Sequence, residues 1–333
     1  MSFAALRRLA SAGAIQIMRN IRDWRNCRGA TRAALILTLW LVPGCASVLD
    51  EDGALTVIPY RIAGSGQIVV DATINEMGPF AFAFDTGASI SVVFDNVRDD
   101  TGLECVADRQ VVIQGMVGSG RFPIAIIDRL RLGNEVWADA RLAAMPGGEL
   151  ARNSIDGILG VDFLDRYAVS FSTEEKVLRL YAPEAVRERS YRGWEAVPLR
   201  QMSVGKGGSN IYVVDIRIGS VTIPALLDLG ATSNIMNWRA ARALRVRPVR
   251  PQETSEIAGA VESAPIVAQL EVKALKTGDL RWARKTFIIA DFPVFGVLGL
   301  DDLPVAIIGA ELFSRRDFVI DFTKHRLLVK TAD

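Results

Sequence analysis

Histidine and cysteine are both scarce in this 333-residue chain, and each scarcity disfavours a class of site. A Ser–His or Cys–His catalytic centre would have to use the single histidine, His325, and so would a zinc site built on imidazoles. The three cysteines, Cys27, Cys45 and Cys105, match no metal-binding spacing, and a chain of this size needs no disulfide framework. We therefore expect no metal and no cofactor, and we interpret Cys105 as an incidental thiol.

Excess charge is lacking as well, because 39 basic residues oppose 38 acidic ones. Nothing in this balance calls for a nucleic-acid partner. Half of the residues are hydrophobic, which is enough for a sizeable core, and the length fits two domains or one bilobal unit. The uncharged run at residues 33–42 is too short to span a bilayer as a helix.

This short apolar run follows a basic leader and precedes small residues, an order typical of a secretory signal. The next residues, Pro43-Gly44-Cys45-Ala46-Ser47, resemble a bacterial lipobox, in which Cys45 would become the lipidated first residue. We expect a periplasmic lipoprotein held at the membrane by this anchor. Plain secretion and an uncleaved N-terminal anchor are the alternatives, and Met18 is an alternative start.

The run at residues 80–84 places aromatics at alternate positions and ends in Asp85-Thr86-Gly87-Ala88-Ser89. This pattern predicts a buried strand that leads into a tight turn. A carboxylate at that point costs free energy unless it is hydrogen-bonded or shares its charge. Taken alone, the pattern fits an Asx-turn after a strand equally well.

A second copy of the pattern favours a site over a turn. The apolar run at 223–227 ends in Asp228-Leu229-Gly230-Ala231-Thr232, and the two aspartates lie 143 positions apart. Further matches follow at nearly the same offset: Asp71 with Asp215, Gly115 with Gly259, and Gly160 with Gly309. Such a repeat indicates two homologous lobes, each of which contributes one carboxylate to a shared site.

These motifs resemble the aspartic peptidases, and specifically the bacterial retropepsin-like group with two lobes on one chain. The resemblance covers roughly residues 55–330 and departs from the family at Leu229, where Thr or Ser is usual. It implies a mainly β fold of two homologous retropepsin/pepsin-like β-barrel lobes with an active-site cleft between them. The domains expected are 1–45 (signal and lipobox), 46–54 (tether), 55–182 (first lobe), 183–194 (linker) and 195–333 (second lobe).

The resemblance also implies roles for particular residues. Asp85 and Asp228 would form the catalytic dyad, supported by Gly87 and Gly230, which permit the tight turn and orient the carboxylates through their N–H groups. Thr86 would bond across the lobe interface, whereas Leu229 has no hydroxyl with which to reciprocate. The segments that end at Gly160 and Gly309 would pack beside the catalytic turns and lead into short helices.

Gly115 and Met116 in the first lobe, and Gly259 in the second, occupy the flap position of the family, where a hairpin covers the substrate. An ordinary glycine-rich hairpin is the alternative for this stretch.

The function expected is a monomeric aspartic endopeptidase that hydrolyses an extended envelope or periplasmic polypeptide through Asp85, Asp228 and an activated water. One alternative is a catalytically weakened fold that binds peptides as an envelope lipoprotein, which the Leu229 substitution motivates. A structural envelope lipoprotein is the other.

Overall fold

The computed structural model describes residues 53–185, 191, 193–204, 209–251, 256–258 and 261–331. These residues belong to one compact unit, Ser47–Asp333. The expected signal, Cys45, nearly all of the tether and Gly259 lie outside the described residues. Within the described part of the chain, no helix is long and apolar enough to cross a membrane, and no group of three or more side chains could hold a metal ion.

The first lobe is built from antiparallel hairpins whose strands alternate buried and exposed residues. Its β2–β3 hairpin turns at the positive-φ residues Asn75 and Glu76. The elements are β1 (Thr56–Ile62), β2 (Ile68–Ile74), β3 (Met77–Phe84), β4 (Val92–Phe94), α1 (Asp95–Thr101), β5 (Cys105–Gln114), β6 (Ser119–Leu132), β7 (Glu135–Met145), α2 (Gly148–Arg152), β8 (Gly157–Leu159), α3 (Val161–Leu164), β9 (Ala168–Ser172) and β10 (Val177–Tyr181).

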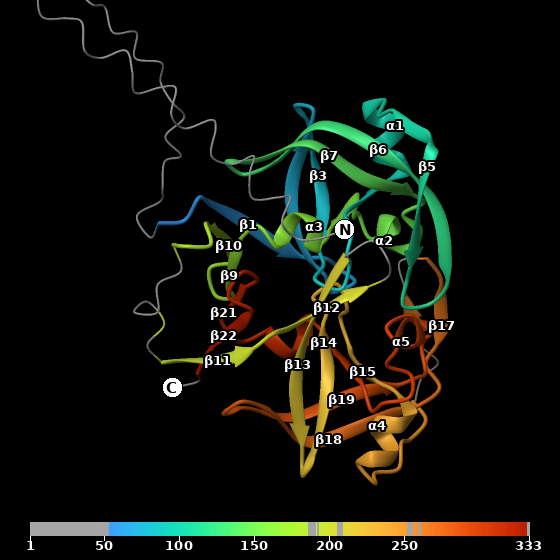
Figure 1. Cartoon of the computed structure of the whole chain (residues 1–333), viewed down its shortest axis with the longest axis vertical. Helices are drawn as coiled ribbons and strands as arrows, with labels where there is room; N and C mark the ends of the chain where they lie inside the picture. The colour runs from blue at the N-terminus through green and yellow to red at the C-terminus, as the bar shows by residue number, and fades with distance from the viewer. Residues whose placement is uncertain are drawn as a thin grey trace, which may run out of the picture. The chain divides into compact units, whose positions relative to one another are not determined.

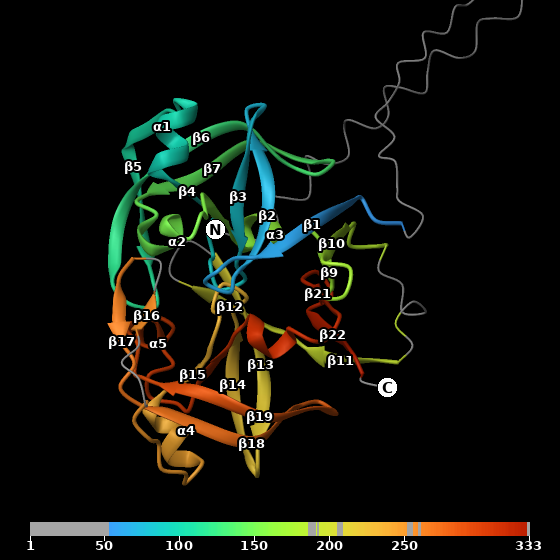
Figure 2. The ribbon, with the colours of Figure 1, turned by 180° about the vertical axis from the view of Figure 1, so that it is seen from behind.

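The second lobe repeats this order of elements, and Figures 1 and 2 show α1 and α4 at opposite ends of the two-lobed unit. Its elements are β11 (Trp194–Pro198), β12 (Arg200–Val204), β13 (Ser209–Ile218), β14 (Val221–Leu227), β15 (Asn234–Met236), α4 (Trp238–Ala243), β16 (Glu256–Ala258), β17 (Ser263–Pro265), β18 (Gln269–Thr277), β19 (Leu280–Ile289), α5 (Pro293–Val297), β20 (Ala306–Ile308), η2 (Ala310–Phe313), β21 (Phe318–Asp321) and β22 (Arg326–Lys330).

One sheet joins the lobes, with strands in the order β11-β22-β21-β9-β10-β1. Its centre is the antiparallel pair β9–β21, in which Phe171 lies opposite Phe318 and their rings stack at 4.4 Å. Each lobe therefore supplies three strands related by the sequence repeat. The single histidine, His325, lies in the turn before β22 with a φ of 48°.

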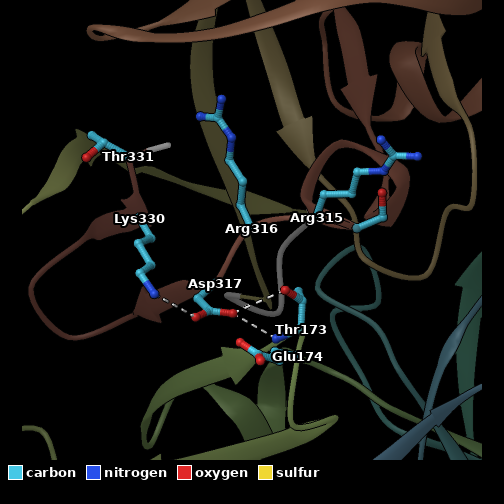
Figure 3. Close-up of a pocket in the computed structure, with 8 residues that line it drawn as sticks. Thr173, Glu174, Arg315, Arg316, Asp317, Lys330 and Thr331 are labelled. Atoms are coloured by element: carbon cyan, nitrogen blue, oxygen red, sulfur yellow. Dashed lines mark hydrogen bonds and ion pairs between the residues drawn. The ribbon is translucent and has the colours of Figure 1, made fainter. Parts of the chain in front are cut away.

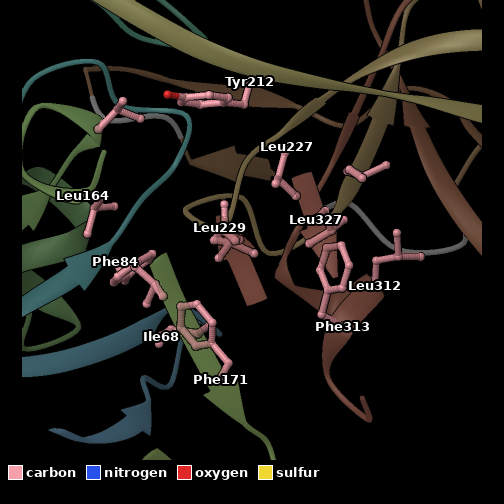
Figure 4. Close-up of a cluster of buried hydrophobic side chains, with 14 of the residues drawn as sticks. Ile68, Phe84, Leu164, Phe171, Tyr212, Leu227, Leu229, Leu312, Phe313 and Leu327 are labelled. Carbon is pink, nitrogen blue, oxygen red and sulfur yellow. The ribbon is translucent and has the colours of Figure 1, made fainter. Parts of the chain in front are cut away.

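The most extensive of the hydrophobic clusters contains buried side chains from both lobes. Figure 4 shows Leu229 of the second lobe in this cluster, together with Phe84 and Phe171 of the first. The prediction of a mainly β chain with two homologous lobes is confirmed.

Candidate active site

Each candidate aspartate directly follows the last residue of a strand that is paired with a parallel neighbour. β3 pairs in parallel with β8, and the Asp85 N–H donates to the Leu159 carbonyl at 3.0 Å. β14 pairs in the same way with β20, and the Asp228 N–H donates to the Ile308 carbonyl, also at 3.0 Å. The backbones of the two aspartates are therefore held by the same strand pairing and the same hydrogen bond in each lobe.

The glycine at the end of each partner strand lets the chain pass close to the turn that follows each aspartate. A Cβ on Gly160 would lie 2.7 Å from the Ala88 carbonyl oxygen, and one on Gly309 would lie 2.5 Å from that of Ala231. The same carbonyls accept hydrogen bonds from the first residues of α3 and η2, at 2.8 and 2.9 Å. The packing and the short helices that the family resemblance implied are both present.

The two carboxyl groups meet between the lobes and hydrogen-bond to each other. Asp85 Oδ1 accepts the N–H groups of Gly87 at 2.7 Å and Ala88 at 3.1 Å. Asp228 Oδ1 accepts the Ala231 N–H at 2.9 Å. Both aspartates lie deep in the interface, yet each keeps part of its surface open to solvent, so water can reach them.

The structure corrects the expected reason for glycine at positions 87 and 230. Neither Gly87 nor Gly230 has a positive φ, so the turn does not require glycine for its backbone conformation. A Cβ on Gly87 would instead lie 2.5 Å from Asp228 Cγ, and a Cβ on Gly230 would collide with the Asp85 carboxyl group. Each glycine therefore makes room for the aspartate of the other lobe.

Burial raises the pKa of both aspartates from the ordinary value of 3.8. The pKa of Asp228 is raised further, because the charge of Asp85 lies beside it. Backbone N–H groups of Gly87, Ala88 and Gly230 stabilise the charged form of Asp85, and those of Ala231 and Gly230 stabilise the charged form of Asp228. Both shifts favour a pair that holds one proton between its two carboxyl groups.

Thr86 joins the lobes beneath the carboxylates, and its side chain is completely buried. Its hydroxyl donates to the Leu227 carbonyl at 2.7 Å and accepts the Leu229 N–H at 3.0 Å. One side chain thus satisfies two backbone groups of the other lobe. Leu229 supplies no reciprocal hydroxyl and packs instead into the shared core, so half of the expected cross-lobe arrangement is present.

Replacement of Thr86 by Ala should destabilise the protein by about 2–6 kcal/mol, because two buried backbone groups each lose their partner at about 1–3 kcal/mol. Chemical denaturation measures the loss. Thr86→Ser keeps the hydroxyl and serves as the matched control, with a loss below that of Ala. Equal losses for Ala and Ser would show that the hydroxyl does not join the lobes.

A second layer of polar residues supports each turn, and the sequence reading missed it. The Ser91 hydroxyl donates to Asp162 Oδ1 at 2.6 Å and accepts the Gly160 N–H at 2.9 Å. In the second lobe, Asn234 accepts the Gly309 N–H at 3.2 Å and donates to Glu311 at 3.3 Å. Burial raises the pKa of Asp162, although the hydrogen bonds from Ser91 act to lower it. The available signal was two polar residues, Ser91 and Asn234, at the 143-residue offset of the aspartates.

The flap predicted at Gly115 and Met116 lies at a hairpin that contacts residues 261–262 of the second lobe. The β5–β6 hairpin turns at Gly115–Gly118, and β16 and β17 flank the equivalent turn of the second lobe. A Cβ on Gly115 would lie 3.3 Å from a Val261 methyl group, and one on Gly118 would lie 2.6 Å from the Glu262 carboxyl carbon. Met116 packs on the apolar cluster of the second lobe, while Val261 packs on that of the first.

A separate polar depression lies beside the C-terminal end of β9 and the N-terminal end of β21, and Figure 3 shows its lining. There Asp317 accepts the Thr173 N–H at 2.8 Å and pairs with Lys330 at 3.5 Å. The aspartate dyad does not line this depression. Asp317 joins the two lobes there through its hydrogen bonds from Thr173, and we assign the depression no catalytic part.

Comparison with known families agrees with this arrangement. Residues 70–166 match the family described as gag-polyprotein putative aspartyl protease, and residues 214–312 match the family described as aspartyl protease. Together the matches cover more than half of the chain. A search of curated proteins found no match. The chain is therefore a two-lobed, retropepsin-like protein with two aspartyl protease domains in tandem.

Proposed function

We propose that the protein is an aspartic endopeptidase in which Asp85 and Asp228 form the catalytic dyad. The observation that carries this proposal is the interlocked contact of the two carboxyl groups, each seated against the glycine of the other lobe. Carboxyl groups that share one proton can act as an acid and a base at the same time. Both groups also retain access to solvent, which general base catalysis on water requires.

In the mechanism we propose, Asp85 is the ionised member, since its turn donates two hydrogen bonds to the charged form. It takes a proton from a bound water, and the resulting hydroxide oxygen attacks the peptide carbonyl carbon. The protonated Asp228 donates its proton to the carbonyl oxygen. The tetrahedral species collapses as Asp85 gives the proton that it took from water to the leaving nitrogen and the C–N bond breaks. Asp228 takes back a proton from a hydroxyl of the tetrahedral carbon as the C=O bond of the new carboxyl group forms, which restores the starting state of the dyad.

The substrate that fits best is an extended polypeptide, because the paired hairpins at Gly115 and Val261 would cover a chain that lies across the dyad. One chain supplies both aspartates, so a monomer suffices. The basic leader and Cys45 motivate a location in the periplasm at the membrane, with an envelope polypeptide as substrate.

A second candidate is a fold that binds peptides without cutting them. Leu229 favours it, because the Leu229 side chain cannot bond to the backbone of the first lobe as Thr86 does to that of the second. A looser dyad would be the consequence, and a displacement of about 1 Å could slow cleavage about a hundredfold.

A cleavage assay of residues 47–333 on a peptide library, from acidic to neutral pH and with and without pepstatin, tests the proposal. We expect pepstatin-sensitive cleavage on the acidic side of neutrality. Should the native sequence bind peptides and cut none at any pH while Leu229→Thr cuts, the binding function replaces the peptidase.

A further inference from the structure

The internal repeat allows the surface charge of the two lobes to be compared at equivalent positions, because α1 and α4 correspond to each other. Residues 95–108, in the first lobe, hold five acidic residues and one arginine, a net charge of −4. Residues 238–251, in the second, hold five arginines and no acidic residue, a net charge of +5. Since the same fold forms with either sign, the arginines are not required by the architecture.

Four of these arginines are free to meet a partner. Arg239 pairs with Asp302 at 2.7 Å and bonds to the Asp301 carbonyl at 2.9 Å, which fixes α4 to the loop before β20. No carboxylate of the described residues pairs with the other four. All four are exposed, and they are Arg242, Arg245, Arg247 and Arg250.

Aliphatic side chains lie exposed among these arginines. Val246 is 46% exposed and Val249 is 59% exposed, so charged and aliphatic residues alternate along the loop after α4. Val249 exchanges backbone hydrogen bonds with Gln269 at 2.8 Å, which brings the loop beside Val267, also 59% exposed. A surface that only keeps charged side chains in water does not require three exposed valines among them.

We propose that this arginine–valine face, formed by the four free arginines with Val246, Val249 and Val267, docks on the surface of an anionic phospholipid bilayer. Guanidinium groups bind phosphate oxygens in pairs. Exposed valines gain free energy when they enter the boundary between headgroups and acyl chains. The face lies on the end of the second lobe remote from α1, so docking would fix how that lobe stands on the membrane (Figure 1).

Vesicle flotation of the full-length chain tests the proposal, with vesicles of phosphatidylcholine alone or with about 30% phosphatidylglycerol. The variant replaces the four free arginines with Gln. The matched control replaces Arg109, Arg121, Arg141 and Arg152 with Gln, which removes the same charge from exposed positions of the first lobe. Any membrane affinity of the N-terminal segment is common to all three chains.

Phosphatidylglycerol should strengthen binding of the native chain and of the control, and about 0.5 M salt should remove the gain. The four-arginine variant should lose the gain, at up to about fivefold for each arginine, or about 1 kcal/mol. Val249→Ser should weaken binding to the anionic vesicles and leave its salt dependence unchanged.

Equal loss in the variant and the control would overturn the proposal, because net charge alone would then explain binding. No response to phosphatidylglycerol in any chain would overturn it as well, and would leave an acidic protein as the partner to seek. Circular dichroism of each chain checks that the exposed substitutions leave the fold intact.

Discussion

Replacement of Asp85 or Asp228 by Asn should abolish measurable peptide cleavage, with a loss of kcat of about 10²–10⁴-fold for removal of one acid–base group. An amide can neither take the proton from water nor give one to the carbonyl oxygen at the dyad. Because the two carboxyl groups act as one unit, the double variant should be little slower than either single variant. Steady-state kinetics on the best library peptide measures all three.

The same variants should change how stability depends on pH. The pKa of Asp228 is raised in the folded state above the ordinary 3.8, so the folded protein holds a proton that the unfolded chain has released. Stability contributed by the protonated group is complete below about pH 4 and declines as pH rises through the raised pKa. Asp228→Asn should therefore melt at a higher temperature than the native chain at neutral pH, and the difference should vanish near pH 4.

Two outcomes would contradict this account. Cleavage that survives in both Asn variants would place the chemistry outside the dyad. A melting temperature of Asp228→Asn that stays below the native value at every pH would show that ionisation of Asp228 does not destabilise the folded protein. Cleavage by the native chain should itself fall at high pH, as the shared proton is lost from the pair.

The repeat in the sequence predicted two homologous lobes whose aspartates meet at a shared site, and the family resemblance predicted the β fold of those lobes. Identical spacing of the apolar run, the aspartate and the glycine constrains both copies to the same local structure, and two copies must pack face to face to bury their strands. The register of β9 against β21 was not predictable, because it depends on which apolar residues of two distant strands fit together.

The sequence was less informative about why particular residues stand in the site. Gly87 and Gly230 suggested a turn that needs glycine, whereas their role follows from the side chain of the opposite lobe, which no local pattern contains. From the sequence, Thr86 was expected to bond across the lobe interface, and Leu229 to offer no hydroxyl in return. In the structure, the Thr86 hydroxyl bonds to two backbone groups of the second lobe. Leucine at position 229 therefore removes the bonds that a hydroxyl there would make to the first lobe, and it leaves the bonds made by Thr86 in place.

Replacement of Gly230 by Ala should cause the largest loss for the smallest chemical change. The added methyl group would occupy the space of the Asp85 carboxyl group, so either Asp85 moves or the lobes separate. A shift of about 1 Å costs roughly a hundredfold in rate, and overpacking costs about 1–3 kcal/mol of stability. Cleavage kinetics and thermal unfolding measure the two losses.

Gly296→Ala in α5 is the matched control, since its new Cβ would meet nothing closer than 4.0 Å and Ala favours a helix. It should keep full activity and equal or greater stability. The double variant Asp85→Ala with Gly230→Ala isolates the contact, because the truncated side chain no longer collides with the methyl group. Its stability should exceed the value expected from adding the two single losses. Simple additivity would mean that Gly230 acts through its own backbone, and that the two lobes do not seat their carboxylates against each other's glycines.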